Sequence, residues 1–314
     1  MQLFAKIPDI DFMSGRRVAM FFSCALIVFS LGSVASRGLN LGVDFTGGVL
    51  LEVGYAGAAN LTDVRNALTD AGYDIALVQN FGSANDVLIR LPPPREGEGA
   101  EDGAAAVRDR VLGTLQEYDA SVLLRRIEFV GPQVGEELTE QGGLAMLFAL
   151  ILIFGYVMLR FNRKFAAGTI TALVHDVIVV IGVFSVFRLS FDLSVLAALL
   201  ATIGYSLNDT IVVFDRIREN FRTIRRSTAE KIVNISINQM LARTLITSFT
   251  TLLVLCALYM WGGQAVSGFA SALIVGVVVG TYSSIYVACT AALALKVSPT
   301  DLLPPKREAI DDMP

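Results

Sequence analysis

The sequence predicts an α-helical membrane protein with six transmembrane helices and one α+β domain inserted between helices 1 and 2. Two observations predict this class. The 314 residues have a mean hydropathy of +0.61 and only 17% charged residues, against about 25% in an average soluble domain. The charges are also uneven, because the stretch from Glu52 to Glu140 is rich in Asp, Glu and Arg while long apolar stretches lie on both sides of it.

Six stretches are long and apolar enough to cross a bilayer, which takes about 20 residues of helix. They are Arg17–Ser36, Gly142–Leu159, Phe165–Phe187, Leu193–Phe214, Thr244–Trp261 and Ser267–Leu295. The first is expected to be retained, because its apolar run is long for a signal peptide and no A-x-A-like cleavage site follows it. We therefore expect helix 1 at 17–36 and helices 2–6 within 142–295.

Lysine and arginine in the short loops predict the orientation. They precede span one, fill the expected loops at 160–164 and 215–243, and follow span six, whereas the opposite short loops carry only Arg188. Short cytoplasmic loops carry the excess of such residues. Both ends of the chain, 1–16 and 296–314, are therefore expected in the cytoplasm, with the inserted domain at 37–141 on the far side.

The inserted domain alternates strand and helix patterns. The expected elements are a strand Val49–Tyr55, a helix Asn60–Gly72, two strands "IALVQNF" and "DVLIRLP" joined by "GSAN", a loop Pro92–Gly103, a helix Ala104–Tyr118 and a strand Ser121–Val130. This order, β-α-β-β-α-β, is that of the split ferredoxin-like arrangement.

An acidic, glycine-containing turn, "LGVDFTGG", leads from span one into the first strand. Gly47 and Gly48 can adopt backbone angles that other residues avoid, so they suit a sharp turn out of the membrane. Asp44 would lie near the outer interface. It either holds the turn by local hydrogen bonds or couples the membrane helices to the inserted domain.

Span four carries an acid well inside its apolar run. Ala197, Ala201, Tyr205 and Asp209 share one helical ridge, and Ser206 lies on the neighbouring ridge. Asp209, next to Asn208, lies six residues inside Asp215, or about 9 Å at 1.5 Å per residue. Ionisable residues at such depth are costly and mark function; the alternative is an interfacial acid.

Two further polar groups point to a proton path. Arg243, at the start of span five, has a side chain long enough to reach Asp209, although it also fits a positive-inside anchor. His175 and Asp176 are adjacent in span three, and a histidine beside an aspartate can relay protons. Their alternative role is a structural hydrogen bond.

Small residues recur every four positions in span six. The ridge consists of Gly268, Ala272, Gly276, Gly280 and Ser284. Such a ridge, with G-x-x-x-G at Gly276–Gly280, lets another helix approach closely. Close packing without a transport role is the more direct interpretation.

Composition excludes several other kinds of site. Cys24, Cys256 and Cys289 all lie in apolar stretches far apart and His175 is the only histidine, so we expect no disulfide framework, metal site or cofactor. A net charge of −4 gives no nucleic-acid signal. We expect no enzyme, because Asp209 is in "YSLND" rather than G-x-G-D and Ser267 is in "AVSGFA" rather than G-x-S-G.

Several motifs together resemble the SecF family of bacterial protein-export membrane subunits. They are "LGVDFTGG", "VGPQVGEEL", "HDV", "GYSLNDTIVVFDRIREN", "ARTLITS" and "GTYSSIY", which cover nearly the whole chain. The resemblance implies half of an RND-type fold in the bacterial cytoplasmic membrane, with a periplasmic domain. It implies a SecD-like partner, the SecYEG translocon, a translocating preprotein and the proton motive force. Asp209 and Arg243 match the acid and arginine that the family uses in its proton-conducting interior.

Two alternatives remain open from sequence. An RND-type small-molecule or lipid exporter usually has two six-span halves and two large external domains, whereas this chain has one half and an insert of about a hundred residues. A plain assembly scaffold would explain the small-residue ridge but not the buried acids.

Overall fold

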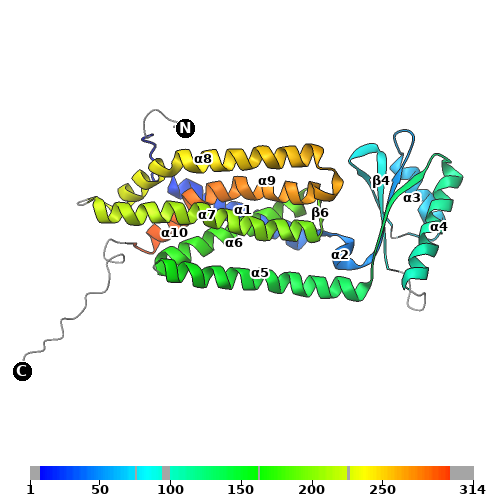
Figure 1. Ribbon diagram of the computed structural model, residues 1–314, viewed down its shortest axis with the longest axis horizontal. Helices are drawn as coiled ribbons and strands as arrows, with labels where there is room; N and C mark the ends of the chain where they lie inside the picture. The colour runs from blue at the N-terminus through cyan, green and yellow to red at the C-terminus, as the bar shows by residue number, and fades with distance from the viewer. Residues whose placement is uncertain (1–7, 75, 94–99, 162, 225–226, 298–314) are drawn as a thin grey trace, which may run out of the picture.

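The computed structural model describes residues 8–74, 76–93, 100–161, 163–224 and 227–297. Over these residues, six helical segments are long and apolar enough to cross a membrane. They are α1 (Arg16–Arg37), α5 (Pro132–Arg160), α6 (Arg163–Val186), α7 (Leu193–Thr223), α8 (Ala229–Trp261) and the run α9 (Gln264–Ser283), η1 (Ser284–Ala288) and α10 (Cys289–Ala294). Figure 1 shows them as a bundle with the inserted α+β domain at one end.

The prediction of a loop at 215–243 is wrong for most of this range. Helix α7 continues to Thr223 and α8 already begins at Ala229, after the N-cap Thr228. Hydropathy falls in this region, but the side chains still favour helix: Arg216 pairs with Glu219 at 2.6 Å, one turn later. The two helices also stay in contact beyond the apolar part, because Asn220 donates a hydrogen bond to Ser236 at 2.8 Å.

Helix α5 also begins earlier than the expected Gly142. It starts at Pro132, directly after β5, because proline at the first helical position has its fixed φ angle already suited to the helix. The inserted domain therefore passes into the second long helix without a separate loop. Of the expected tail at 296–314, residues 298–314 lie outside the described part of the chain.

The inserted domain has the element order β-α-β-β-α-β. Its elements are β2 (Gly48–Gly54), α3 (Leu61–Asp70), β3 (Leu77–Phe81), β4 (Ser83–Leu91), α4 (Ala100–Tyr118) and β5 (Leu123–Val130). The sheet order is β3-β4-β2-β5, and all neighbouring strands are antiparallel. The "GSAN" turn is tighter than expected, because only Gly82, with φ +76°, separates the two strands.

Alternation of side chains gives this sheet two different faces. Val49, Leu51 and Val53 of β2 are fully buried and form the core with α3 and α4, which lie on the side of the sheet away from the bundle (Figure 1). The other face carries Leu50 and Arg90, which are paired across β2 and β4. This second face is turned toward the ends of the membrane helices.

A short parallel ribbon lies between the sheet and the bundle. Strand β1 (Asn40–Leu41) pairs with β6 (Ser190–Phe191), which immediately precedes α7. A single helical turn, α2 (Val43–Thr46), follows β1 and leads into β2. The segment after α1 is thereby joined to the start of α7, about 150 residues later in the sequence.

The start of the described chain is tied to α8. The Ile10 N–H donates to Asn238 Oδ1 at 3.0 Å, and the Ile10 carbonyl accepts from Asn238 Nδ2 at 2.7 Å. Asn234 accepts from the Phe12 N–H at 2.8 Å. These bonds satisfy backbone groups that lie just before the first long helix.

Candidate functional site

His175 and Asp176 form a polar centre in the middle of α6. Both are only 1% exposed, and His175 Nδ1 lies 3.0 Å from Asp176 Oδ1. Asp176 Oδ2 accepts hydrogen bonds from Ser206 on α7 at 2.6 Å and from Ser283 on α9 at 2.7 Å. The carboxyl group of Asp176 therefore connects three helices.

Asp209 forms a second polar centre on α7. It is 6% exposed, and Oδ1 accepts a hydrogen bond from Thr244 on α8 at 3.1 Å. Oδ2 accepts a longer bond, 3.4 Å, from Ser284 at the start of η1. The inward position expected for Asp209 is thus observed, with hydroxyl groups rather than a cation as its direct partners in the described chain.

Arg243 differs from the expectation of a direct pair with Asp209. Within the described residues the two form no ion pair; the Arg243 side chain is exposed and acts on Asp209 only through a longer-range Coulomb attraction. The reason is helical geometry: consecutive residues point about 100° apart, so Thr244 faces α7 while Arg243 faces outward. A side-chain rotation would be needed to bring the guanidinium to the carboxylate.

The other residues predicted on span four separate into two groups. Tyr205 donates to Ser248 on α8 at 3.1 Å, and Ser248 in turn lies 2.7 Å from Thr281 on α9, so this hydroxyl line belongs to the polar interior. Asn208 is exposed on the outer face of α7 and is not brought to either acid. Its position one residue before Asp209 turns it away from the bundle.

The small-residue ridge packs inside the chain. A Cβ atom on Gly276 would collide with the Thr202 side chain of α7, and one on Gly280 would lie 3.1 Å from Ser206 Cβ. Gly268 is similarly close to Val195, at 3.2 Å, while Ala272 and Ser284 are fully buried. The ridge therefore brings α9 close enough to α7 for Ser284, which directly follows α9, to reach Asp209.

The "VDFTGG" segment contacts the start of α7. Asp192 is the N-cap of α7, and its side chain accepts from the Val195 N–H at 3.0 Å. Asp44 adds a second acceptor, which binds the Leu193 N–H at 2.9 Å. Carboxylates at a helix N-terminus are stabilised by its unpaired N–H groups and its dipole.

Both glycines of this segment have backbone angles that favour glycine. Gly47 has φ +67° and Gly48 has φ +125°. A Cβ on Gly47 would lie 2.8 Å from Pro132 Cα, and one on Gly48 would collide with the Leu91 carbonyl oxygen. This turn thus fits tightly against the start of α5 and the end of β4.

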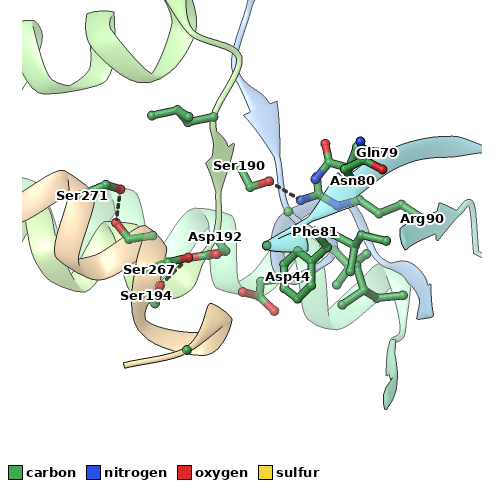
Figure 2. Close-up of a pocket in the computed structure, with 18 of the residues that line it drawn as sticks. Asp44, Gln79, Asn80, Phe81, Arg90, Ser190, Asp192, Ser194, Ser267 and Ser271 are labelled. Atoms are coloured by element: carbon green, nitrogen blue, oxygen red, sulfur yellow. Dashed lines mark hydrogen bonds between the residues drawn. The ribbon is translucent and has the colours of Figure 1, made fainter. Parts of the chain in front are cut away.

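Sequence reasoning missed Arg90, which joins the sheet to the β1–β6 ribbon. It donates to Ser190 Oγ at 2.6 Å, to the Leu41 carbonyl at 3.2 Å and to Asn40 Oδ1 at 3.3 Å. Figure 2 shows the Arg90–Ser190 bond beside Asp44 and Asp192. Partial burial lowers the pKa of Arg90, and the carboxylates of Asp192 and Asp44 oppose this effect.

A cavity of about 800 Å³ lies between the open sheet face and the helix ends. Its walls include Arg90 and Phe81 from the sheet and Asp44, Asp192 and Ser271 from the membrane side (Figure 2). Arg90 and the β1–β6 ribbon bridge the two parts of the molecule beside this space, and β5 runs directly into α5.

Within the described part of the chain, six apolar helices surround the buried carboxyl groups of Asp176 and Asp209, which defines a multi-pass α-helical membrane protein with an ionisable interior. The family model "Protein export membrane protein SecD/SecF, C-terminal" matches residues 111–298, and "SecD/SecF GG Motif" matches residues 32–59. The chain belongs to the SecF family of protein translocase subunits.

The relatives match over their full length. "Protein translocase subunit SecF" of Vibrio alginolyticus is 50% identical over 318 residues, covering 100% of this chain and 99% of the relative. The protein of the same name from Pseudomonas aeruginosa is 50% identical over 312 residues, covering 98% and 99%.

Among solved structures, the chain is similar to SecDF of Thermus thermophilus, described as a translocon-associated membrane protein, with a TM-score of 0.84 and 36% identity. The match covers 94% of this chain and 40% of the SecDF chain. SecDF in a super-membrane-facing form matches with the same identity and coverage but a TM-score of 0.69. The two solved forms thus differ in conformation over the region that corresponds to this chain.

Proposed function

We propose that the chain is a subunit of a proton-motive-force-driven membrane complex that assists late-stage Sec-dependent preprotein translocation. Full-length identity to SecF relatives supports the translocation role and favours it over export of small molecules or lipids. The observation that carries the proton role is the burial of Asp176 and Asp209 inside an apolar bundle. Charged groups there are costly, so gain or loss of a proton changes which helix packing is favourable.

In the proposed proton path, Asp209 and Asp176 are the proton-binding groups. His175 is the neighbour that exchanges a proton with Asp176, and Ser206 and Tyr205 extend the polar line toward α8 and α9. Arg243 is the cation that approaches Asp209 in one conformational state. The two solved SecDF forms match this chain with different TM-scores, which supports more than one conformational state.

The partner in this proposal is a SecD-like subunit. Support comes from the SecDF chain, of which this chain matches 40%, so that the remainder has room for a second half. Large apolar side chains are exposed along α1, α5 and α8, including Phe21, Leu152 and Val254, as expected of helices that face lipid or another membrane subunit. The SecYEG translocon and the translocating preprotein are the further partners.

The inserted domain is, in this proposal, a periplasmic ferredoxin-like domain. Its element order and its sheet order, with antiparallel neighbours throughout, support that fold. The basic residues between α5 and α6 lie at the end of the bundle away from the domain, which supports a cytoplasmic location for that end and for both termini in a bacterial inner membrane.

The experiment measures export of a reporter preprotein into inverted membrane vesicles, with and without an imposed proton gradient. Asp209→Asn keeps the side-chain shape but fixes a neutral group. We expect normal levels and normal assembly with the SecD-like partner, and loss of the gradient-dependent stimulation. Arg243→Met is expected to have the same effect.

Asp215→Asn is the matched control. Asp215 lies on the same helix and pairs with Arg160 at 3.0 Å, but both side chains are about half exposed, and such pairs contribute about 0–1 kcal/mol. It should retain the stimulation. Full stimulation in the Asp209→Asn vesicles would contradict the proton role and leave Asp209 as a structural polar residue.

A further inference from the structure

The last membrane helix is interrupted by one π-helical turn, η1, directly beside the acids. It covers Ser284–Ala288, between α9 and α10. A π turn places its backbone hydrogen bonds five residues apart, and single turns of this kind are rare and frequent at functional sites. Ser283 ends α9 and Ser284 begins η1, so the change of helix type falls between them.

These consecutive serines bind two acids on two different helices. Ser283 Oγ donates to Asp176 Oδ2 on α6 at 2.7 Å. Ser284 Oγ donates to Asp209 Oδ2 on α7 at 3.4 Å. Both serines are fully buried. Adjacent residues on a helix point about 100° apart, so one short segment can reach both neighbours at once.

Each of these hydroxyl groups also has a second acceptor within its own helix. Ser283 Oγ lies 3.2 Å from the Gly280 carbonyl, and Ser284 Oγ lies 3.1 Å from the Thr281 carbonyl. An ionised carboxylate only accepts hydrogen bonds, whereas a protonated one carries a donor of its own. A serine hydroxyl that loses its acceptor can therefore turn back to the carbonyl without becoming unpaired.

We propose that Ser283 and Ser284 are positioning residues through which the last helix responds to the charge of both acids. With both acids ionised, each hydroxyl points outward and the segment is tied to α6 and α7 together. Protonation of one acid removes the hydrogen bond that its serine donates to it, and that serine hydroxyl then donates to the carbonyl of its own helix. The shared π turn passes this change to the environment of the other acid. This inference rests on the proposed proton role of Asp176 and Asp209.

Other titratable groups face this segment. They are His175 on α6, Arg243 on α8, and Tyr282, Tyr286 and Cys289 on the last helix itself. His175 contacts Asp176, and Arg243 acts on Asp209. Helix α7 also links the acids, because it carries Asp209 and its Ser206 binds Asp176. The serine pair is the segment outside α6 and α7 that binds both acids among the described residues, so we assign to it the response of the last helix.

The test uses the full chain, with its SecD-like partner, in proteoliposomes. Dicyclohexylcarbodiimide, which modifies protonated carboxyl groups in apolar surroundings, is applied over a pH series, and modification of Asp176 and Asp209 is read separately by mass spectrometry. Ser283→Ala should shift the pH midpoint of its own acid, Asp176, by about one unit, a ten-fold change in proton affinity. It should also shift that of Asp209. Ser284→Ala should shift both in the same way.

Ser271→Ala is the control, because Ser271 lies on α9 and its hydroxyl donates to the Gly268 carbonyl at 2.9 Å, far from both acids. Ser284→Thr, which keeps the hydroxyl, should restore the original midpoints. If each serine variant shifts only its own acid, or neither, the coupling is absent and the inference is overturned. That result is distinct from failure of the proton role, which is read from Asp209→Asn in the export assay.

Discussion

The Asp44 carboxylate accepts a hydrogen bond from the Leu193 backbone N–H at 2.9 Å. An acid in the segment that enters the inserted domain therefore caps the helix that carries Asp209. From Leu193 to Asp209 the helix is continuous and spans about 24 Å at 1.5 Å per residue. One continuous helix thus joins the turn at Asp44 to the buried acid.

We predict that Asp44→Ala weakens this joint without unfolding the chain. Loss of a capping side chain costs about 0.5–2 kcal/mol, and the N-cap Asp192 remains in place. Amide hydrogen exchange in the first turn of α7 should become faster, and gradient-dependent export should decrease. Asp70→Ala, an exposed acid at the end of α3, is the control. Unchanged exchange and export would show that the Asp44 contact does not couple the two parts.

Arg90→Met is predicted to loosen the inserted domain from the bundle. It removes hydrogen bonds from a charged group to Ser190, Leu41 and Asn40, and bonds of this kind contribute about 1.5–3 kcal/mol. Spin labels on the sheet and on α8 should give a broader distance distribution, while the melting of the domain itself changes little. Arg108→Met, which removes an exposed arginine on α4, provides the comparison. Identical distributions in both variants would mean that the Arg90 hydrogen bonds do not hold the domain in place.

Gly47→Ala is predicted to be destabilising by more than about 1 kcal/mol, because φ is +67° and the added methyl group would lie 2.8 Å from Pro132 Cα. Gly57→Ala is the matched control, since nothing lies within 4 Å of its Cβ position and its φ is not positive. The melting temperature in detergent is measured for both variants. Equal melting temperatures would contradict the tight fit described for this turn.

Gly276→Leu is predicted to separate α9 from α7. Even a Cβ atom collides with Thr202, and overpacking typically costs about 1–3 kcal/mol. Because this ridge packs inside the chain, we expect loss of protease resistance in the isolated subunit, before any partner is added. Gly204→Leu, on α7 but with open space around it, should remain resistant. Resistance in both variants would show that the ridge tolerates bulk.

The proposed orientation predicts that residue 57 faces the periplasm and residue 223 the cytoplasm. Gly57→Cys and Thr223→Cys, in a background without the native cysteines, place single thiols at exposed positions. An impermeant thiol reagent added to intact cells should label position 57 and not position 223. The reverse pattern would overturn the orientation, and with it the export direction.

Local patterns predicted the elements that depend on local physics. Hydropathy located the membrane-length segments, and the strand patterns located β2 and β5 within two residues. The inward position of Asp209 followed from the small residues on its ridge. The end of α7 and the start of α8 were not predicted, because polar residues there remain helical through contacts between the two helices, such as Asn220 with Ser236.

The partners of the acids depend on how the helices are arranged, which the pattern along one helix does not contain. Ser283 binds Asp176 across more than a hundred residues of sequence, and Thr244 rather than Arg243 faces Asp209. Arg90 was missed for the same reason, because its targets on the β1–β6 ribbon come together only in the folded chain.

The bonds between Ile10 and Asn238 have a consequence for biogenesis. Their partners are 228 residues apart in the chain, and synthesis at about 5–20 residues per second separates them by roughly 10–45 s. During that interval the segment before α1 has no α8 to bind, so its backbone groups remain exposed. A chain that stops before α8 therefore leaves these backbone groups without their partners, whereas in the completed chain Asn234 and Asn238 bind them.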